Sequence, residues 1–100
     1  MRLDIPLPPF LTLMAVWAAV EAAARALGLT VTLRTPSAKH PGSTHWHLKQ
    51  ARTPGVVEAT YSPQQHQLWL SIQPRAVSEH TLELAEKLRA EIERNLLPKA

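Results

Sequence analysis

The chain has 100 residues, which is enough for one small domain with a single two-layer core. Its 45% hydrophobic and 19% charged residues are ordinary for a globular protein. Cysteine is absent, which excludes disulfides, thiolate zinc sites and cysteine nucleophiles. This absence is compatible with the reducing cytoplasm, where we expect the protein to be located. We therefore predict one domain over residues 1–100.

The net charge of +3 is unevenly distributed along the chain. Five of the eight acidic residues fall within residues 79–93, whereas residues 22–78 contain six basic residues and a single acidic one, Glu58. Four of the five histidines also lie in that basic stretch. The distribution indicates an anionic partner, or else charge that only keeps the surface hydrated.

The first 28 residues are predicted to form a proline-rich arm and a helix. Pro6, Pro8 and Pro9 define the arm, residues 1–9, and the helix follows them and ends at Gly28. The uncharged run is too short for a membrane span, and Asp4 cancels the charge that a secretory leader needs, so we expect neither. The alanine-rich side of the helix reflects either simple helix propensity or close packing against another helix or protomer. The predicted buried stripe contains Phe10, Leu13, Met14, Trp17, Val20, Ala24 and Leu27.

Four strands are predicted next, at 29–34, 43–51, 56–61 and 67–73, because apolar and polar residues alternate there. Turn-forming residues at 35–42 predict a mobile loop. Pairing Ala51 with Val56 closes the first hairpin and places Lys49 opposite Glu58. Pairing Tyr61 with His66 closes the second and places Glu58 beside Trp69. The core face would then carry Leu29, Val31, Leu33, Trp46, Leu48, Val57, Ala59, Leu68, Leu70 and Ile72.

The last element is predicted to be an amphipathic helix that Ser78 caps and that ends near Asn95. Its buried stripe contains Ala85, Leu88, Ile92 and Leu96. The predicted fold is an α+β two-layer sandwich in the order helix, four-stranded antiparallel meander, helix, with both helices packed on one face of the sheet.

Trp69 is the most informative residue of the outer sheet face, because its alternation with Leu68 and Leu70 places it among polar residues. A large aromatic side chain in such a position usually contacts a partner. We therefore predict a small non-enzymatic binding module whose partner is either a protein, including a second copy in a homodimer, or a nucleic acid. Neither a membrane nor a small-molecule substrate is indicated. The expected binding surface comprises Arg34, His45, His47, Lys49, Glu58, Trp69, Ser71 and Gln73.

His45 and His47 project to the same side of one predicted strand, close enough to share a metal ion. Glu58 on the next strand, or His40 or His66 from a loop, would supply a third ligand. Because Glu58 is expected to pair with Lys49, and no second pair of ligand residues has suitable spacing, we predict no metal and no cofactor. The two histidines are then polar residues of a hydrated strand face.

The segment Gly42-Ser43-Thr44-His45 follows a helix and a first strand. It resembles the Gly-Ser-His turn of the HicA-type toxin ribonucleases, although this chain has an inserted threonine and an extra strand. The resemblance covers four or five residues and the order of elements. It implies a fold like that of double-stranded-RNA-binding domains and a catalytic role for His45 in cutting RNA. The alternative function is thus a small histidine-dependent RNA-cleaving enzyme that uses His45 or His47.

Overall fold

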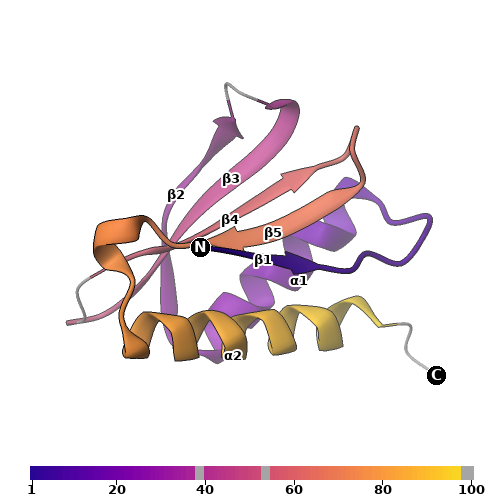
Figure 1. The fold of residues 1–100 in the computed structure, drawn as a ribbon. Coiled ribbons are helices and arrows are strands. Elements are labelled where there is room, and N and C mark those ends of the chain that lie inside the picture. The colour runs from indigo at the N-terminus through magenta and orange to yellow at the C-terminus, as the bar shows by residue number, and fades with distance from the viewer. Residues whose placement is uncertain (38–39, 53–54, 98–100) are drawn as a thin grey trace.

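The computed structural model describes residues 1–37, 40–52 and 55–97 (Figure 1). Its elements are, in chain order, β1 (Arg2–Ile5), α1 (Leu13–Ala26), β2 (Leu29–Ser37), β3 (His40–Gln50), β4 (Val57–Ser62), β5 (Gln67–Ser71), a short 3-10 turn η1 (Pro74–Ala76) and α2 (Glu79–Leu96). Strands β2 and β3 extend into the region predicted as a loop at 35–42, of which residues 38 and 39 lie outside the described part.

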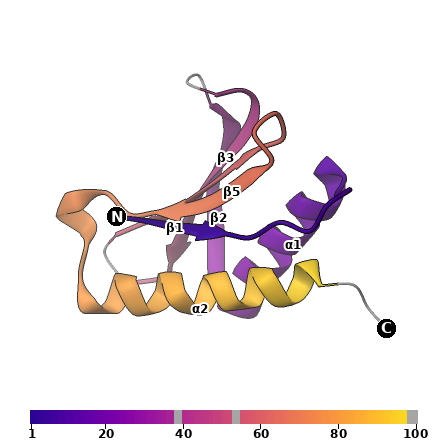
Figure 2. The same cartoon turned by 45° about the vertical axis from the view of Figure 1, so that its right-hand side comes forward.

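The five strands form one antiparallel sheet in the order β1-β5-β4-β3-β2. Both helices lie on the same side of this sheet and pack against each other, as the two views in Figures 1 and 2 show. The predicted α+β class with an antiparallel sheet is therefore confirmed. The predicted strand count of four is wrong, because the sheet has a fifth strand.

The fifth strand is β1, which lies in the segment predicted as an arm. It pairs with β5, so that Arg2 is opposite Ser71 and Ile5 is opposite Leu68. Arg2 and Asp4 alternate with Leu3 and Ile5, and Ile5 is buried. This alternation is the pattern of a strand, but it lasts only four residues before prolines remove the backbone donors that a longer ladder would need.

The three strands β3, β4 and β5 present the predicted faces but pair in another register. Leu48 lies opposite Val57 and Ala59 opposite Leu70, two residues away from the predicted partners. A shift of two residues keeps every side chain on its face, so the apolar pattern alone cannot detect it. The turns determine the register instead. His66 has a φ of 52°, which places it in the turn and not in the strand.

A β-bulge in β2 corrects the predicted faces of that strand. Val31 pairs with Leu48, but Leu33 pairs with His47, so one extra residue lies between the two pairs. Beyond the bulge the alternation is inverted. Leu33 therefore lies beside His47, on the face of the sheet that points away from the helices. Arg34 lies opposite Trp46, on the face that points toward the helices. The predictions that Leu33 is a core residue and that Arg34 is an outer-face residue are both wrong.

Helix α1 begins later than predicted and buries another face. Thr12 caps it by accepting a hydrogen bond from the Ala15 amide. Phe10 has a φ of 64° and is fully exposed, and Met14 is also exposed, so the predicted stripe is wrong at its start. Small side chains let α1 approach α2 closely, and this packing decides which face is buried. The buried residues are Val16, Ala19, Val20, Ala23 and Ala24.

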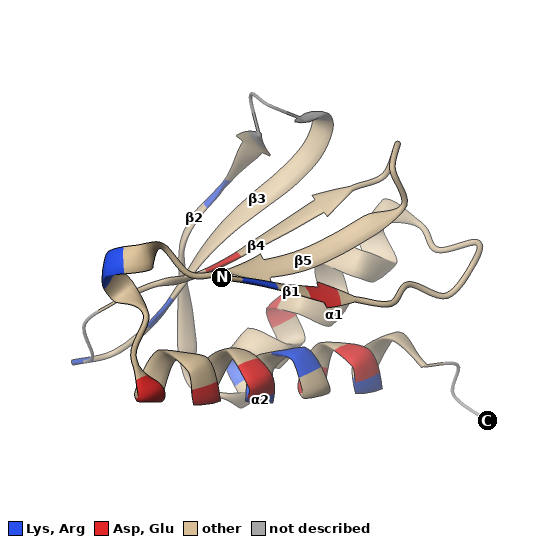
Figure 3. Cartoon of the chain, in the orientation of Figure 1, with Lys and Arg blue, Asp and Glu red and all other residues tan. Residues whose placement is uncertain are grey.

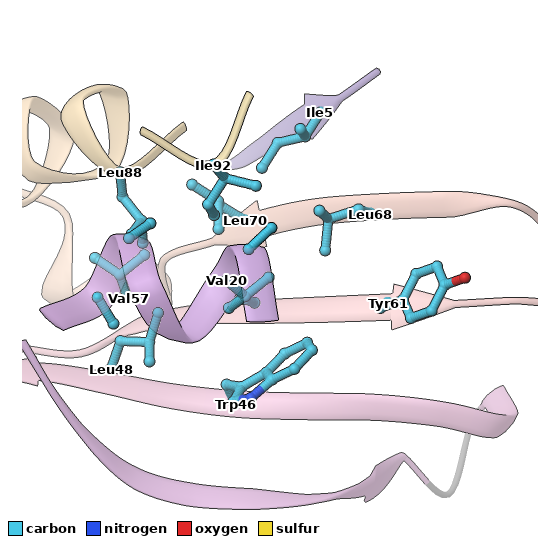
Figure 4. Close-up of a cluster of buried hydrophobic side chains, with 14 of the residues drawn as sticks. Ile5, Val20, Trp46, Leu48, Val57, Tyr61, Leu68, Leu70, Leu88 and Ile92 are labelled. Atoms are coloured by element: carbon cyan, nitrogen blue, oxygen red, sulfur yellow. The ribbon is translucent and has the colours of Figure 1, made fainter. Parts of the chain in front are cut away.

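Helix α2 agrees with the prediction. Ser78 caps it in a reciprocal arrangement with Thr81, and the four predicted stripe residues are buried. Its charged residues follow the exposed side of the helix (Figure 3). Both helices thus cover the inner face of the sheet, and the core lies between the two layers (Figure 4). Its largest fully buried side chains are Trp46, Leu48, Leu68, Leu70, Ile72, Leu88, Ile92, Val16, Val20 and Val57.

Candidate metal centre

The face of the sheet that the helices leave uncovered, which we call the outer face, brings two histidines and one glutamate together. His45 and His47 alternate on β3 with the buried Trp46. Glu58 on β4 lies directly opposite His47, and Thr60 lies opposite His45. The ladder between β3 and β4 therefore positions all of these side chains on one side of the sheet.

The three ionisable side chains converge on one point. The Nε2 atom of His45 lies 2.8 Å from Oε1 of Glu58, and Nε2 of His47 lies 3.3 Å from the same oxygen. The imidazole rings are 5.1 Å apart and inclined by 77°. One ligand atom from each residue lies within 4.8 Å of the other two. We call these three residues the His–Glu triad.

A fourth residue orients the first histidine. Nδ1 of His45 is 2.8 Å from the hydroxyl oxygen of Thr60, which is buried. This hydrogen bond holds the ring so that its other nitrogen, Nε2, faces Glu58. Histidine ligands of metal ions are commonly held in this manner by a partner on the second ring nitrogen.

The triad can be reached from solvent although it is partly enclosed. The side-chain exposures of His45, His47 and Glu58 are 22%, 33% and 14%. Partial burial strengthens the attraction between the carboxylate and any positive charge beside it, since less water screens the interaction. The three side chains are therefore accessible to solvent, while water screens their charges less than at a fully exposed site.

The prediction of no metal site depended on a register that the structure corrects. Lys49 was expected opposite Glu58, but it pairs with Thr30 of β2 and is exposed. The two-residue shift places His47 opposite Glu58 instead. The sequence signal was present, as a His-x-His strand followed by a strand with a lone glutamate. The register that places these two strands side by side depends on the geometry of the turn between them, which the apolar pattern does not predict.

Trp69 lies on the outer face as predicted, but it is not an exposed platform. Its strand neighbours are Thr60 and Asp4, and only 8% of the residue is exposed. The guanidinium of Arg2 lies 4.1 Å above the indole ring, in the geometry of a cation–π contact. The expectation that Trp69 offers an open aromatic surface is therefore wrong, because β1 and its arginine cover it.

The remaining predicted surface residues are dispersed. Ser71 lies opposite Glu58 and is half-buried, whereas Gln73 is exposed beyond the end of β5. Arg34 is on the other side of the sheet, where it pairs with Glu21 at 2.8 Å. A depression of about 210 Å³ adjoins the triad, and its lining residues are His47, Gly55, Val56, Glu58, Gln73, Arg75 and Ala76.

A polar network that the sequence did not reveal joins α1 to the sheet. A carboxylate oxygen of Glu21 accepts hydrogen bonds from Nε1 of Trp46 at 3.1 Å and from Arg34. The guanidinium of Arg34 also lies 4.5 Å above the ring of Trp17. Burial raises the pKa of Glu21, but these two hydrogen bonds and the charges of Arg34 and Arg25 outweigh it, so the pKa lies below its ordinary value of 4.5. In the sequence, this network is indicated only by the position of Glu21, a charged residue among the alanines of the helix.

The segment that resembles the toxin turn lies inside strand β3. Ser43 and Thr44 are buried, and Thr44 accepts a hydrogen bond from the indole of Trp17 at 3.0 Å. Thr44 therefore has a packing role between the sheet and α1. Of the described helices, neither is both long and apolar enough to cross a membrane. No family model, curated protein or solved structure matches this chain.

Proposed function

We propose that this protein is a small non-enzymatic binding module and that the outer face binds a divalent transition-metal ion, Zn²⁺ in the first place, through the His–Glu triad. The observation that carries the proposal is the convergence of one ligand atom from each of His45, His47 and Glu58. Imidazole nitrogens and carboxylate oxygens are ordinary zinc ligands.

The separations of the ligand atoms suit such an ion. Ligands about 2.0–2.1 Å from a tetrahedral ion lie roughly 3.3 Å from one another. The nitrogen of His47 is already 3.3 Å from the glutamate oxygen. A small side-chain movement would lengthen the 2.8 Å separation between His45 and Glu58 to that value. Thr60 supplies the outer hydrogen bond that a metal-bound His45 needs.

Three protein ligands leave one position of a tetrahedral ion open. Structural zinc sites are usually closed by four protein ligands, and the core of this domain is complete on the other side of the sheet. A site with an open position suits the reversible binding of an ion or of a further ligand. We therefore assign the metal to binding and not to holding the fold together.

The alternative function, RNA cleavage, has less support at His45, the residue to which the resemblance assigns catalysis. A catalytic base must present a free ring nitrogen to its substrate. Both ring nitrogens of His45 contact protein groups, Glu58 on one side and Thr60 on the other. A stacking surface for nucleic acid is also disfavoured, because Trp69 is covered.

The proposal is tested by calorimetric titration of the untagged protein with Zn²⁺. We expect one ion per chain. His47→Ala and Glu58→Gln each remove a ligand and should weaken binding more than about 100-fold, since even the loss of an outer-shell partner costs 10–100-fold. Thr60→Val should fall within that smaller range.

His80→Ala is the matched control, because His80 is exposed on α2 and its ring hydrogen-bonds Gln50. Its zinc affinity should equal that of the wild type. Absence of zinc binding, or equal losses in the control and the triad variants, would refute the proposal. RNA cleavage that requires His45 and no metal would support the alternative instead.

A further inference from the structure

The depression beside the triad has residues from two parts of the chain in its lining. His47 and Glu58 belong to the triad, whereas Gln73 and Arg75 come from the segment where the chain leaves β5 and forms η1. Within residues 1–37, 40–52 and 55–97, neither the Arg75 guanidinium nor the Gln73 amide contacts an acid or a hydrogen-bond acceptor. A cation and an amide that line the depression beside a candidate metal site thus retain their binding capacity.

The rest of the lining is apolar. Val56 and Ala76 contribute side chains, and Gly55 contributes backbone alone. A ligand that fills the depression would therefore meet both a positive charge and hydrocarbon. Ligand sites commonly combine an apolar lining with a few placed polar groups of this kind.

We infer that the depression binds a small carboxylate with a short apolar body, held by the metal ion at its open position and by Arg75. The inference rests on the proposed function, because it needs the ion in the His–Glu triad. The planar guanidinium matches the two oxygens of a carboxylate, and Gln73 can donate a further hydrogen bond. Val56 and Ala76 would contact the apolar body.

The apolar part of the lining favours a carboxylate over a phosphate. Val56 and Ala76 can contact the hydrocarbon body of a carboxylate, whereas inorganic phosphate has no apolar part. Among the described residues that line the depression, Arg75 is the one Lys or Arg. A monocarboxylate needs only one cation beside the metal.

The test uses the untagged protein loaded with Co²⁺, whose visible absorption changes when the ligands of the ion change. Isovalerate, acetate and inorganic phosphate are titrated separately. We expect isovalerate to change the spectrum at the lowest concentration, acetate at a higher one, and phosphate at the highest. Arg75→Gln should weaken isovalerate binding about 10- to 100-fold, the loss typical of a charged hydrogen bond, while Co²⁺ affinity stays within about twofold.

Arg94→Gln is the control, because Arg94 is exposed on α2, on the other side of the sheet, and it should bind isovalerate as the wild type does. Failure of Co²⁺ to bind would refute the proposed function and the inference with it. Normal Co²⁺ binding with no response to isovalerate, or with phosphate the tightest ligand, would overturn the inference alone. An unchanged isovalerate affinity in Arg75→Gln would also overturn it.

Discussion

Trp69 shows how far the sequence could describe a single residue. The alternation around it correctly predicts the sheet face on which it lies. It cannot predict the exposure, because the covering residue, Arg2, belongs to a strand at the other end of the chain. His45, His47 and Glu58 were likewise selected individually, but their convergence depends on register, which no single residue encodes. The sheet face on which a side chain lies follows from the local sequence. Its exposure, and the side chains that lie beside it, depend on the tertiary structure.

The covered position of Trp69 predicts a stability effect. Trp69→Ser should lower the free energy of unfolding by about 3 kcal/mol, because it removes a large buried side chain and the cation–π contact with Arg2. Gln73→Ser, at an exposed position, should change it by less than about 0.5 kcal/mol. Urea denaturation of both variants measures the difference. Equal stabilities would mean that the indole is a surface group after all.

At the scale of elements, predictability follows the strength of the local pattern. Helix α2 has a cap, a stripe of four residues and a charged side, and it was predicted closely. Strand β1 is too short for a strong pattern and was missed. The bulge in β2 inverts the faces without any change in the sequence alternation, so only the pairing with β3 reveals it.

The bulge can be tested within one strand. Leu29 lies before it and is 6% exposed, whereas Leu33 lies after it and is 42% exposed. Leu29→Ser should cost about 2–4 kcal/mol of unfolding free energy, since it buries a hydroxyl and leaves a cavity. Leu33→Ser should cost less than about 1 kcal/mol. Similar losses from the two substitutions, measured by thermal and urea denaturation, would indicate a strand without the bulge.

For the whole molecule, the network around Glu21 connects the helical layer to the sheet. Its carboxylate links α1 to Trp46 of β3 and Arg34 of β2. The bulge is the reason that Arg34 reaches it, because the inverted alternation turns this arginine toward the helices. A local irregularity in one edge strand thus provides a contact between the two layers.

This network predicts how stability depends on pH. The pKa of Glu21 is below 4.5 in the folded protein, so its carboxylate stabilises the fold fully above pH 4.5. The contribution is lost as pH falls below that value through the lowered folded pKa. Wild type should therefore exceed Glu21→Gln in stability at neutral pH, and the difference should shrink during acidification. Chemical denaturation at a series of pH values measures it, with Glu93→Gln of α2 as the control. A difference that is constant with pH would contradict the assignment.

The pairing of β1 with β5 has a consequence for the nascent chain on the ribosome. Arg2 pairs with Ser71, so β1 cannot pair until the ribosome has synthesised the residues between them. At about 5–20 residues per second this synthesis takes roughly 3–14 s. Strand β5 is apolar and would be prone to pair with other chains if its edge stayed open. Its partner, however, has already been synthesised when β5 emerges. The order of translation therefore gives this edge of β5 a partner from the moment that β5 can fold.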